Sequence, residues 1–253
     1  MPSLRTDALV LRYTDYSNSS RIFTLFTRDL GKVDAIAKGS RRLKGPFENA
    51  LDLLSVCDIV LLYKSNETLD LVTEASLVER FAALGANLAT MYAGCYLAEL
   101  LTELTQPHDP HPRLFDSAVI TLRYLNHSPL DRRRIMRFEL ALLRELGLMP
   151  SLETCVHCGM PPLPAQADLP VAFGLATGGV ICADCRPGQP HVATLSGQTL
   201  ELLRALTQPG NVWRSIGSPR DETMAREVVA SVICHLLGRR PRMHRYLFSG
   251  NDM

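Results

Sequence analysis

The chain has 253 residues, of which 46% are hydrophobic and 21% are charged. This length suits one large domain or two to three small ones, and the hydrophobic fraction excludes a wholly disordered chain. The 27 basic and 26 acidic residues nearly cancel. The chain as a whole is therefore not a polycation, and attraction for nucleic acid would require an uneven distribution of charge.

No apolar run approaches the ~18 to 20 residues that span a bilayer, so no membrane partner is expected. The first residues, MPSLRTD, lack a basic region followed by an apolar core, which a secretory signal would have. We therefore expect a cytoplasmic protein.

Residues 4–75 predict β structure because short apolar runs alternate with turn signals. Asp29-Leu30-Gly31 is such a signal, since glycine adopts the positive φ of a tight turn. Five strands in such a short segment favour a small closed barrel of the OB type, and an SH3-like barrel fits the same count. The expected strands cover residues 4–12, 21–28, 31–38, 51–64 and 68–74.

Basic residues are concentrated in the same region. Residues 1–45 contain nine Lys or Arg and four Asp, whereas residues 46–80 contain two basic and seven acidic residues. The densest cluster lies at residues 38–44, with four cations and no acid beside Gly39 and Gly45. Such a cluster can be a solvated surface or a phosphate-binding site. Its lack of acidic residues favours phosphate binding.

From Ser76 the apolar residues recur every three to four positions, which predicts a helix that starts near residue 77 and runs to about residue 104. The proline-rich segment 107–112 ends it. Further helices are predicted at residues 114–125, 130–146, 198–206 and 222–237. Residues 150–194 contain seven prolines and little periodicity, so we interpret them as an insertion within one helical domain.

Four cysteines supply a source of order for this insertion. Cys155 and Cys158 form one CxxC pair, and Cys182 and Cys185 form a second. Two such pairs can hold one ion in a tetrahedral four-thiolate site, which favours a single structural Zn²⁺ without an open position for catalysis. A redox CxxC or an iron–sulfur cluster is an alternative use of these thiols. Disulfides are disfavoured because no signal peptide is expected.

Together these patterns predict a multi-domain α+β protein. An N-terminal five-stranded OB-type β-barrel occupies residues 1–76, and an all-α helical domain occupies residues 77–149 and 195–246. A four-cysteine zinc module is inserted at residues 150–194, and residues 247–253 form a tail. The sequence contains no Walker A, GxSxG, HExxH or GxGxxG motif, so we expect no catalytic residues and no enzymatic turnover.

The order of several short motifs resembles the RecO family of bacterial DNA repair proteins. The N-terminal motifs are ALVL at 8–11, DYSNSSRI at 15–22, LFT at 25–27, GK at 31–32 and AKGSRR at 37–42. RFELALL at 137–143 and LG at 146–147 then precede the cysteine motif. The resemblance runs over nearly the whole chain, from about residue 4 to about residue 240.

The resemblance implies an OB-fold followed by a helical domain with a zinc module. It implies a recombination mediator of the bacterial nucleoid that binds single- and double-stranded DNA and anneals complementary strands. With RecR, such a protein helps to load RecA onto DNA covered by the single-strand-binding protein SSB. In an OB barrel the basic residues on and near the third strand would line an electropositive groove. The candidate DNA-binding residues are Arg21, Lys32, Lys38, Arg41, Arg42 and Lys44.

Aromatic residues complete a single-strand site, because bases stack on them. Tyr13 and Tyr16 are the candidates for exposure, while Phe23 and Phe26 fit a barrel core. The acidic SSB tail would need a cation beside an apolar groove, and Arg133 and Arg137 with Phe138 and Leu142 offer that combination. The alternative is that Phe138 and Leu142 belong to the core face of their helix.

Three functions compete on these observations. The first is a DNA-binding, strand-annealing mediator without turnover. The second is an enzyme with a nonstandard site, which would show a carboxylate cluster in a cleft and dependence on Mg²⁺. The third is a zinc-containing protein-interaction adaptor whose DNA affinity is incidental. The resemblance places the mediator first.

Overall fold

A computed structural model of the chain describes residues 3–42, 47, 50–62, 69–161 and 170–248. The chain divides into two compact units. Unit 1 combines residues 1–131 with residues 241–253, and unit 2 consists of residues 132–240. Among the described helices, none is both long enough and apolar enough to cross a membrane.

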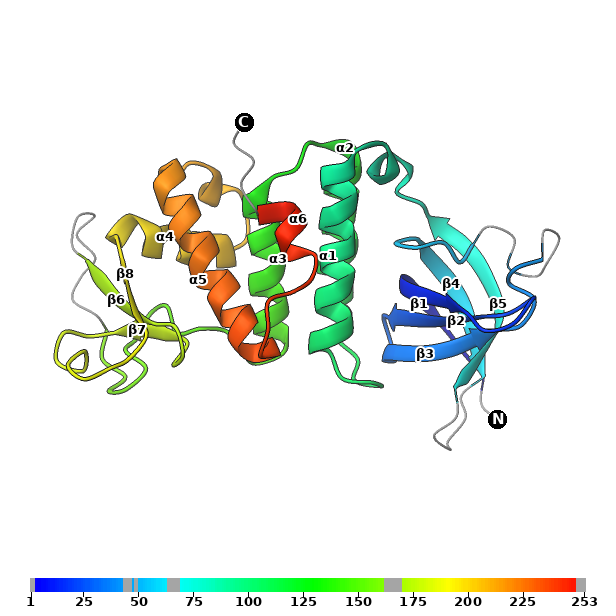
Figure 1. The fold of residues 1–253 in the computed structure, drawn as a ribbon, viewed down its shortest axis with the longest axis horizontal. Coiled ribbons are helices and arrows are strands. Elements are labelled where there is room, and N and C mark those ends of the chain that lie inside the picture. The colour runs from blue at the N-terminus through cyan, green and yellow to red at the C-terminus, as the bar shows by residue number, and fades with distance from the viewer. Residues whose placement is uncertain (1–2, 43–46, 48–49, 63–68, 162–169, 249–253) are drawn as a thin grey trace. The chain divides into compact units, whose positions relative to one another are not determined.

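The N-terminal sheet of unit 1 contains five strands, as the sequence predicted (Figure 1). They close in the order β1-β2-β3-β5-β4, and β3 and β5 pair in parallel. Alternate side chains, among them Val10, Phe23 and Leu25, point into a buried core. The strands are β1 (Ser3–Asp15), β2 (Arg21–Thr27), β3 (Gly31–Ala37), β4 (Val56–Leu62) and β5 (Asp70–Glu79).

The helices of unit 1 begin later than the periodicity predicted. Strand β5 continues to Glu79, which pairs with Val56 of β4, and a 3₁₀ turn η1 (Ala82–Ala86) follows. Helix α1 (Leu88–Leu104) starts only after Asn87, whose side chain accepts hydrogen bonds from the backbone N–H groups of the first turn. The predicted start near residue 77 was therefore wrong, because the spacing of apolar residues runs across three different elements.

Helices α1 and α2 (Pro112–His127) pack with the barrel in unit 1. The rings of Phe26 and Phe115 lie 6.3 Å apart, and Arg28 Nη2 lies 3.0 Å from the Asp116 carboxylate. Gly31 has φ +69°, and a Cβ atom there would lie 2.1 Å from the carbonyl oxygen of Asp109. Only glycine allows the β2–β3 turn to approach the loop between α1 and α2 this closely. These contacts explain why the compact unit extends beyond the boundary near residue 76 that the sequence suggested.

The C-terminal segment also belongs to unit 1. Helix α6 (His244–Phe248) packs against α1, with the rings of Tyr92 and Tyr246 4.8 Å apart (Figure 1). The carboxylate of Glu99 accepts hydrogen bonds from the backbone N–H groups of Arg242 and Met243 at 2.7 and 2.9 Å.

Unit 2 contains three longer helices and a small sheet. The helices are α3 (Arg132–Glu145), α4 (Gly197–Thr207) and α5 (Pro219–Leu237), with a 3₁₀ turn η2 (Val212–Arg214) before α5. The strands β6 (Val171–Gly174), β7 (Gly179–Ile181) and β8 (Val192–Leu195) pair in the order β7-β6-β8. The sequence shows little periodicity in this region, because strands of three to four residues are too short to show a period.

Candidate nucleic-acid interface and metal centre

One end of the barrel gathers most of the basic residues that the sequence singled out. Strand pairing sets Asp15 opposite Arg21, and Arg21 opposite Ala37, so the ends of β1, β2 and β3 are adjacent. The segment after β3 folds onto the β1–β2 turn, where the backbone N–H of Arg41 donates to the Ser19 carbonyl at 3.2 Å. We name this group the barrel-end cluster. Its members are Tyr13, Asp15, Tyr16, Arg21, Lys38, Arg41 and Arg42.

The cations of the cluster are largely accessible. Lys38, Arg41 and Arg42 are exposed, and Arg21 is half-buried. The guanidinium of Arg41 also donates to the Ser17 carbonyl at 3.0 Å, which holds it over the β1–β2 turn. Lys44, the remaining cation of the 38–44 segment, lies outside the described residues.

Asp15 is the acidic member of the cluster, and it was not among the predicted site residues. Arg21 Nε donates to its carboxylate at 2.9 Å, and Arg41 Nη1 lies 3.3 Å from the other oxygen. The hydrogen bond from Arg21, aided by the charge of Arg41, lowers the pKa of Asp15 against the opposing effect of burial. The carboxylate therefore stays ionised and ties two cluster arginines together.

The aromatic residues divide as predicted. Tyr16 and Tyr13 are 64% and 40% exposed, whereas Phe23 is buried in the barrel core and Phe26 is buried next to Phe115 of α2. The guanidinium of Arg21 lies over the Tyr13 ring, 4.5 Å from its centroid. The barrel-end cluster thus combines cations with exposed tyrosine rings, which is the composition that single-stranded nucleic acid requires.

Lys32 lies elsewhere. It stands at the start of β3, and six residues at ~3.3 Å each separate it from Lys38 by ~20 Å along the strand. Its ammonium donates to the carbonyl oxygens of Thr102 and Thr105 at 2.5 and 2.6 Å, at the C-terminal end of α1. Burial lowers the pKa of Lys32. The structure therefore gives Lys32 a role in joining the barrel to a helix.

The four cysteines of the two CxxC pairs come together in unit 2. Their Sγ atoms all lie within 4.8 Å of one another, and those of Cys158 and Cys182 are 3.7 Å apart. Four thiolates at ~2.3 Å from one Zn²⁺ in tetrahedral geometry would be separated by ~3.8 Å. The spacing of these sulfur atoms therefore fits a four-thiolate metal site.

The backbone around the cysteines explains this convergence. Cys155 N–H donates to the Met160 carbonyl, and Gly159 N–H donates back to the Cys155 carbonyl, which forms a tight turn around the first pair. Burial alone would raise the pKa of Cys155, but backbone hydrogen bonds at Cys182, Cys158 and His157 lower it to about 6. Among the described residues, the apolar cluster that includes the site is small, and its buried members are Cys155, Ala172 and Ile181. A metal ion bound by the four thiols would add stability to such a module.

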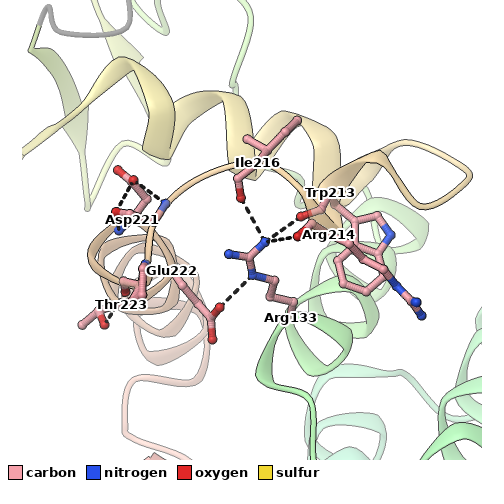
Figure 2. A network of polar contacts seen from close by, with 9 residues as sticks. Arg133, Trp213, Arg214, Ile216, Asp221, Glu222 and Thr223 are labelled. Carbon is pink, nitrogen blue, oxygen red and sulfur yellow. Dashed lines mark hydrogen bonds and ion pairs between the residues drawn. The ribbon is translucent and has the colours of Figure 1, made fainter.

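The residues considered for the SSB tail are engaged inside unit 2. Arg133 Nε lies 2.7 Å from the Glu222 carboxylate, and its Nη1 donates to the carbonyls of Trp213 and Ile216 at 2.7 and 2.9 Å (Figure 2). Arg137 donates to the carbonyls that end α4, at Leu206 and Gln208. Phe138 and Leu142 are buried in the core. The two arginines are thus bound to backbone oxygens of unit 2. Phe138 and Leu142 are buried and form no exposed groove.

Two family models match the chain. One, described as recombination protein O N terminal, covers residues 1–81, and the other, recombination protein O C terminal, covers residues 85–245. A DNA repair protein RecO from Rhodopirellula baltica is 43% identical over 199 residues, covering 79% of this chain and 73% of that protein. Its namesake from Anaeromyxobacter dehalogenans strain 2CP-C is 35% identical over 98% of this chain and 96% of its own. The Myxococcus xanthus protein of the same name is 32% identical over 92% of each chain.

Proposed function

Because this chain belongs to the RecO family of DNA repair proteins, we propose that it binds DNA through the barrel-end cluster and anneals complementary strands without catalytic turnover. Family membership supports a function in DNA repair and recombination. The finer assignment, to single- and double-stranded DNA and to annealing, follows the family resemblance, and the residues of the cluster support the contact with DNA.

The barrel supplies the scaffold. Its strand order, with β3 and β5 in parallel, supports an OB-type barrel, a fold whose strand faces and loops bind oligonucleotides. Arg21, Lys38, Arg41 and Arg42 would contact phosphates, while the exposed rings of Tyr13 and Tyr16 would stack on bases. Neither interaction reads sequence, so we expect little sequence preference.

The presence of several cations and two exposed tyrosines at one barrel end carries this proposal. Annealing brings two polyanions together, so a protein that promotes it must reduce phosphate repulsion without trapping either strand. A small basic surface does this by releasing counterions, and its affinity then falls steeply with salt.

The four cysteines would hold one structural zinc ion. A site with four thiolates leaves no position for a substrate or water, so the ion would stabilise the module and perform no chemistry. Cys155, Cys158, Cys182 and Cys185 are the proposed ligands.

Partners follow from the family. We propose RecR as a binding partner, and SSB-coated DNA as the substrate onto which RecA is loaded. Contact between the SSB tail and Arg133, Arg137, Phe138 and Leu142 stays a prediction, and it would require Phe138 and Leu142 to become accessible.

Strand annealing by the purified full-length protein tests the proposal. A labelled oligonucleotide and its complement are mixed over a salt series without ATP or Mg²⁺. We expect annealing faster than the spontaneous rate, with a steep loss as salt rises. The triple variant Lys38→Ala, Arg41→Ala, Arg42→Ala should bind at least about tenfold more weakly, with a salt slope lower by about 2 if each side chain neutralises one phosphate.

A matched variant separates local contact from net charge. Arg113, Arg132 and Arg220 are exposed and lie outside the cluster, so replacing them with Ala removes the same charge from other surfaces. Equal losses in the two triple variants would show that the cluster has no special role. An absence of DNA binding at low salt would favour the protein-interaction adaptor instead.

A further inference from the structure

Asp15 is an unexpected residue for a surface that binds a polyanion. Segments 13–22 and 37–42 contain four basic residues, and Asp15 is their one acidic residue. Its side chain is 51% exposed, so a ligand at the cluster can reach it. The negative charge of this carboxylate repels phosphate, so its presence in a DNA-binding surface needs an explanation.

The geometry of Asp15 links two separate segments. Its Oδ1 accepts a hydrogen bond of 2.9 Å from Nε of Arg21, which lies opposite Asp15 on β2. Its Oδ2 lies 3.3 Å from Arg41 Nη1, which belongs to the segment after β3. Both carboxylate oxygens therefore face a cluster arginine.

A phosphodiester presents the same chemistry as this carboxylate. Each offers two oxygens that share one negative charge, and guanidinium groups bind both through the same N–H donors. A phosphate that binds Nε of Arg21 or Nη1 of Arg41 would therefore have to displace an oxygen of Asp15. In the DNA-free protein the carboxylate occupies these two donors, while the other N–H groups of the guanidiniums are not paired with it.

We propose that Asp15 competes with nucleic-acid phosphates for Arg21 and Arg41, and so sets the affinity and release rate of the barrel-end cluster. This inference rests on the proposed DNA-binding role of the cluster. A bound strand gains full contact with the two arginines, through all of their donors, only at the expense of their ion pairs with Asp15. Each strand is then held weakly enough to be released once it has paired with its complement.

The variant Asp15→Asn tests this competition, because the amide keeps the shape of the side chain and removes its charge. Weak exposed ion pairs predict that single-stranded DNA binds about three- to thirtyfold more tightly to the variant. The salt slope should become steeper by up to about 1.4, if two arginines each gain a full phosphate contact. Fluorescence anisotropy with a labelled oligonucleotide measures both quantities, and stopped-flow chase with unlabelled DNA measures release.

Two controls separate competition from general electrostatics. Asp58 pairs with Arg5 on the same barrel, with Arg5 Nε 3.0 Å from its Oδ1, so Asp58→Asn removes the same charge and a similar ion pair. It should leave affinity near the wild-type value. Asp15→Glu retains the carboxylate and should bind DNA more like the wild type than Asp15→Asn does.

The background Arg21→Ala, Arg41→Ala makes the test specific. If Asp15 acts through these arginines, adding Asp15→Asn there should produce no further gain in affinity. Unchanged or weaker binding by Asp15→Asn in the otherwise wild-type chain would overturn the inference, since the carboxylate would then be neutral or needed to position the arginines. The proposed function fails separately, if the triple variant at Lys38, Arg41 and Arg42 binds DNA as the wild type does.

Discussion

Two groups of arginines, one in each unit, are used in opposite ways. At the barrel end of unit 1, Arg41 and Arg42 are exposed. In unit 2, by contrast, Arg133 and Arg137 donate to backbone carbonyls, and Arg226 Nη2 lies 2.8 Å from the fully buried carboxylate of Glu139. A local concentration of arginine therefore does not by itself indicate a polyanion site. What separates the two groups is exposure: Arg41 stays exposed although it donates to the Ser17 carbonyl, whereas Arg133 and Arg137 are half-buried among their acceptors.

Removal of the metal should have the largest effect on stability, and this effect should be confined to unit 2. Metal analysis is expected to find one ion per chain, and Cys158→Ser should lower that content sharply. Because metal binding contributes directly to folding in such modules, chelation should expose residues 150–194 to proteolysis. DNA binding by the barrel-end cluster should persist. Cys95→Ala, which alters a half-buried cysteine outside the site, should retain the metal.

Arg133→Ala should destabilise unit 2 by about 2 to 4 kcal/mol, because it leaves several carbonyls and the Glu222 carboxylate without their donor. Urea unfolding measures this loss. Its neighbour Arg132 is exposed, and Arg132→Ala should change stability by less than about 0.5 kcal/mol. Equal effects of the two substitutions would contradict the internal role of Arg133.

Asp221 connects the starts of α4 and α5 and makes the stability of unit 2 depend on pH. Burial alone would raise the pKa of Asp221, but hydrogen bonds from Ser196, Ser218 and Thr199 hold it well below its usual range. The stabilisation is therefore complete above the ordinary carboxyl pKa of ~3.9 and is lost as pH falls through the lower folded value. Asp221→Asn should lower the free energy of unfolding by about 1 to 3 kcal/mol at neutral pH. The difference from wild type should shrink below pH ~4, as measured by urea unfolding across pH.

The smallest expected effect comes from a comparison of Lys32, near the start of β3, with Lys38, which directly follows the end of that strand. Lys32→Met should cost about 1 kcal/mol of stability, because it removes a cation from the carbonyls at the C-terminus of α1. It should leave DNA affinity unchanged. Lys38→Met should leave the stability unchanged in thermal unfolding and should lower the DNA affinity measured by anisotropy. A loss of DNA affinity in Lys32→Met would return this residue to the DNA-binding set.

The sequence predicted most of the elements whose signals are local. The five strands and the CxxC pairs follow from alternation and from ligand spacing, which depend on neighbouring residues. The start of α1 was misjudged because an apolar spacing of three to four residues also arises by chance where β5, η1 and α1 succeed one another. Asn87, a good N-cap residue, was the available signal.

The hydrogen bonds of Arg133 and Lys32 to backbone carbonyls could not be predicted from the sequence. Their acceptors are backbone carbonyls far along the chain, and every residue has one, so no side-chain pattern indicates the pairing. Asp15 could have been found, because it is the one acid among the basic residues of its two segments.

The return of residues 241–248 to unit 1 has a consequence for synthesis on the ribosome. Unit 2 is contiguous, so all of its residues emerge before the segment that packs on α1. During translation, Tyr92 and Glu99 of α1 lack their C-terminal contacts until the last residues have been synthesised, although the barrel is synthesised first. The inserted unit can therefore finish folding before the unit that encloses it in the sequence, the reverse of the usual N-to-C order of domains.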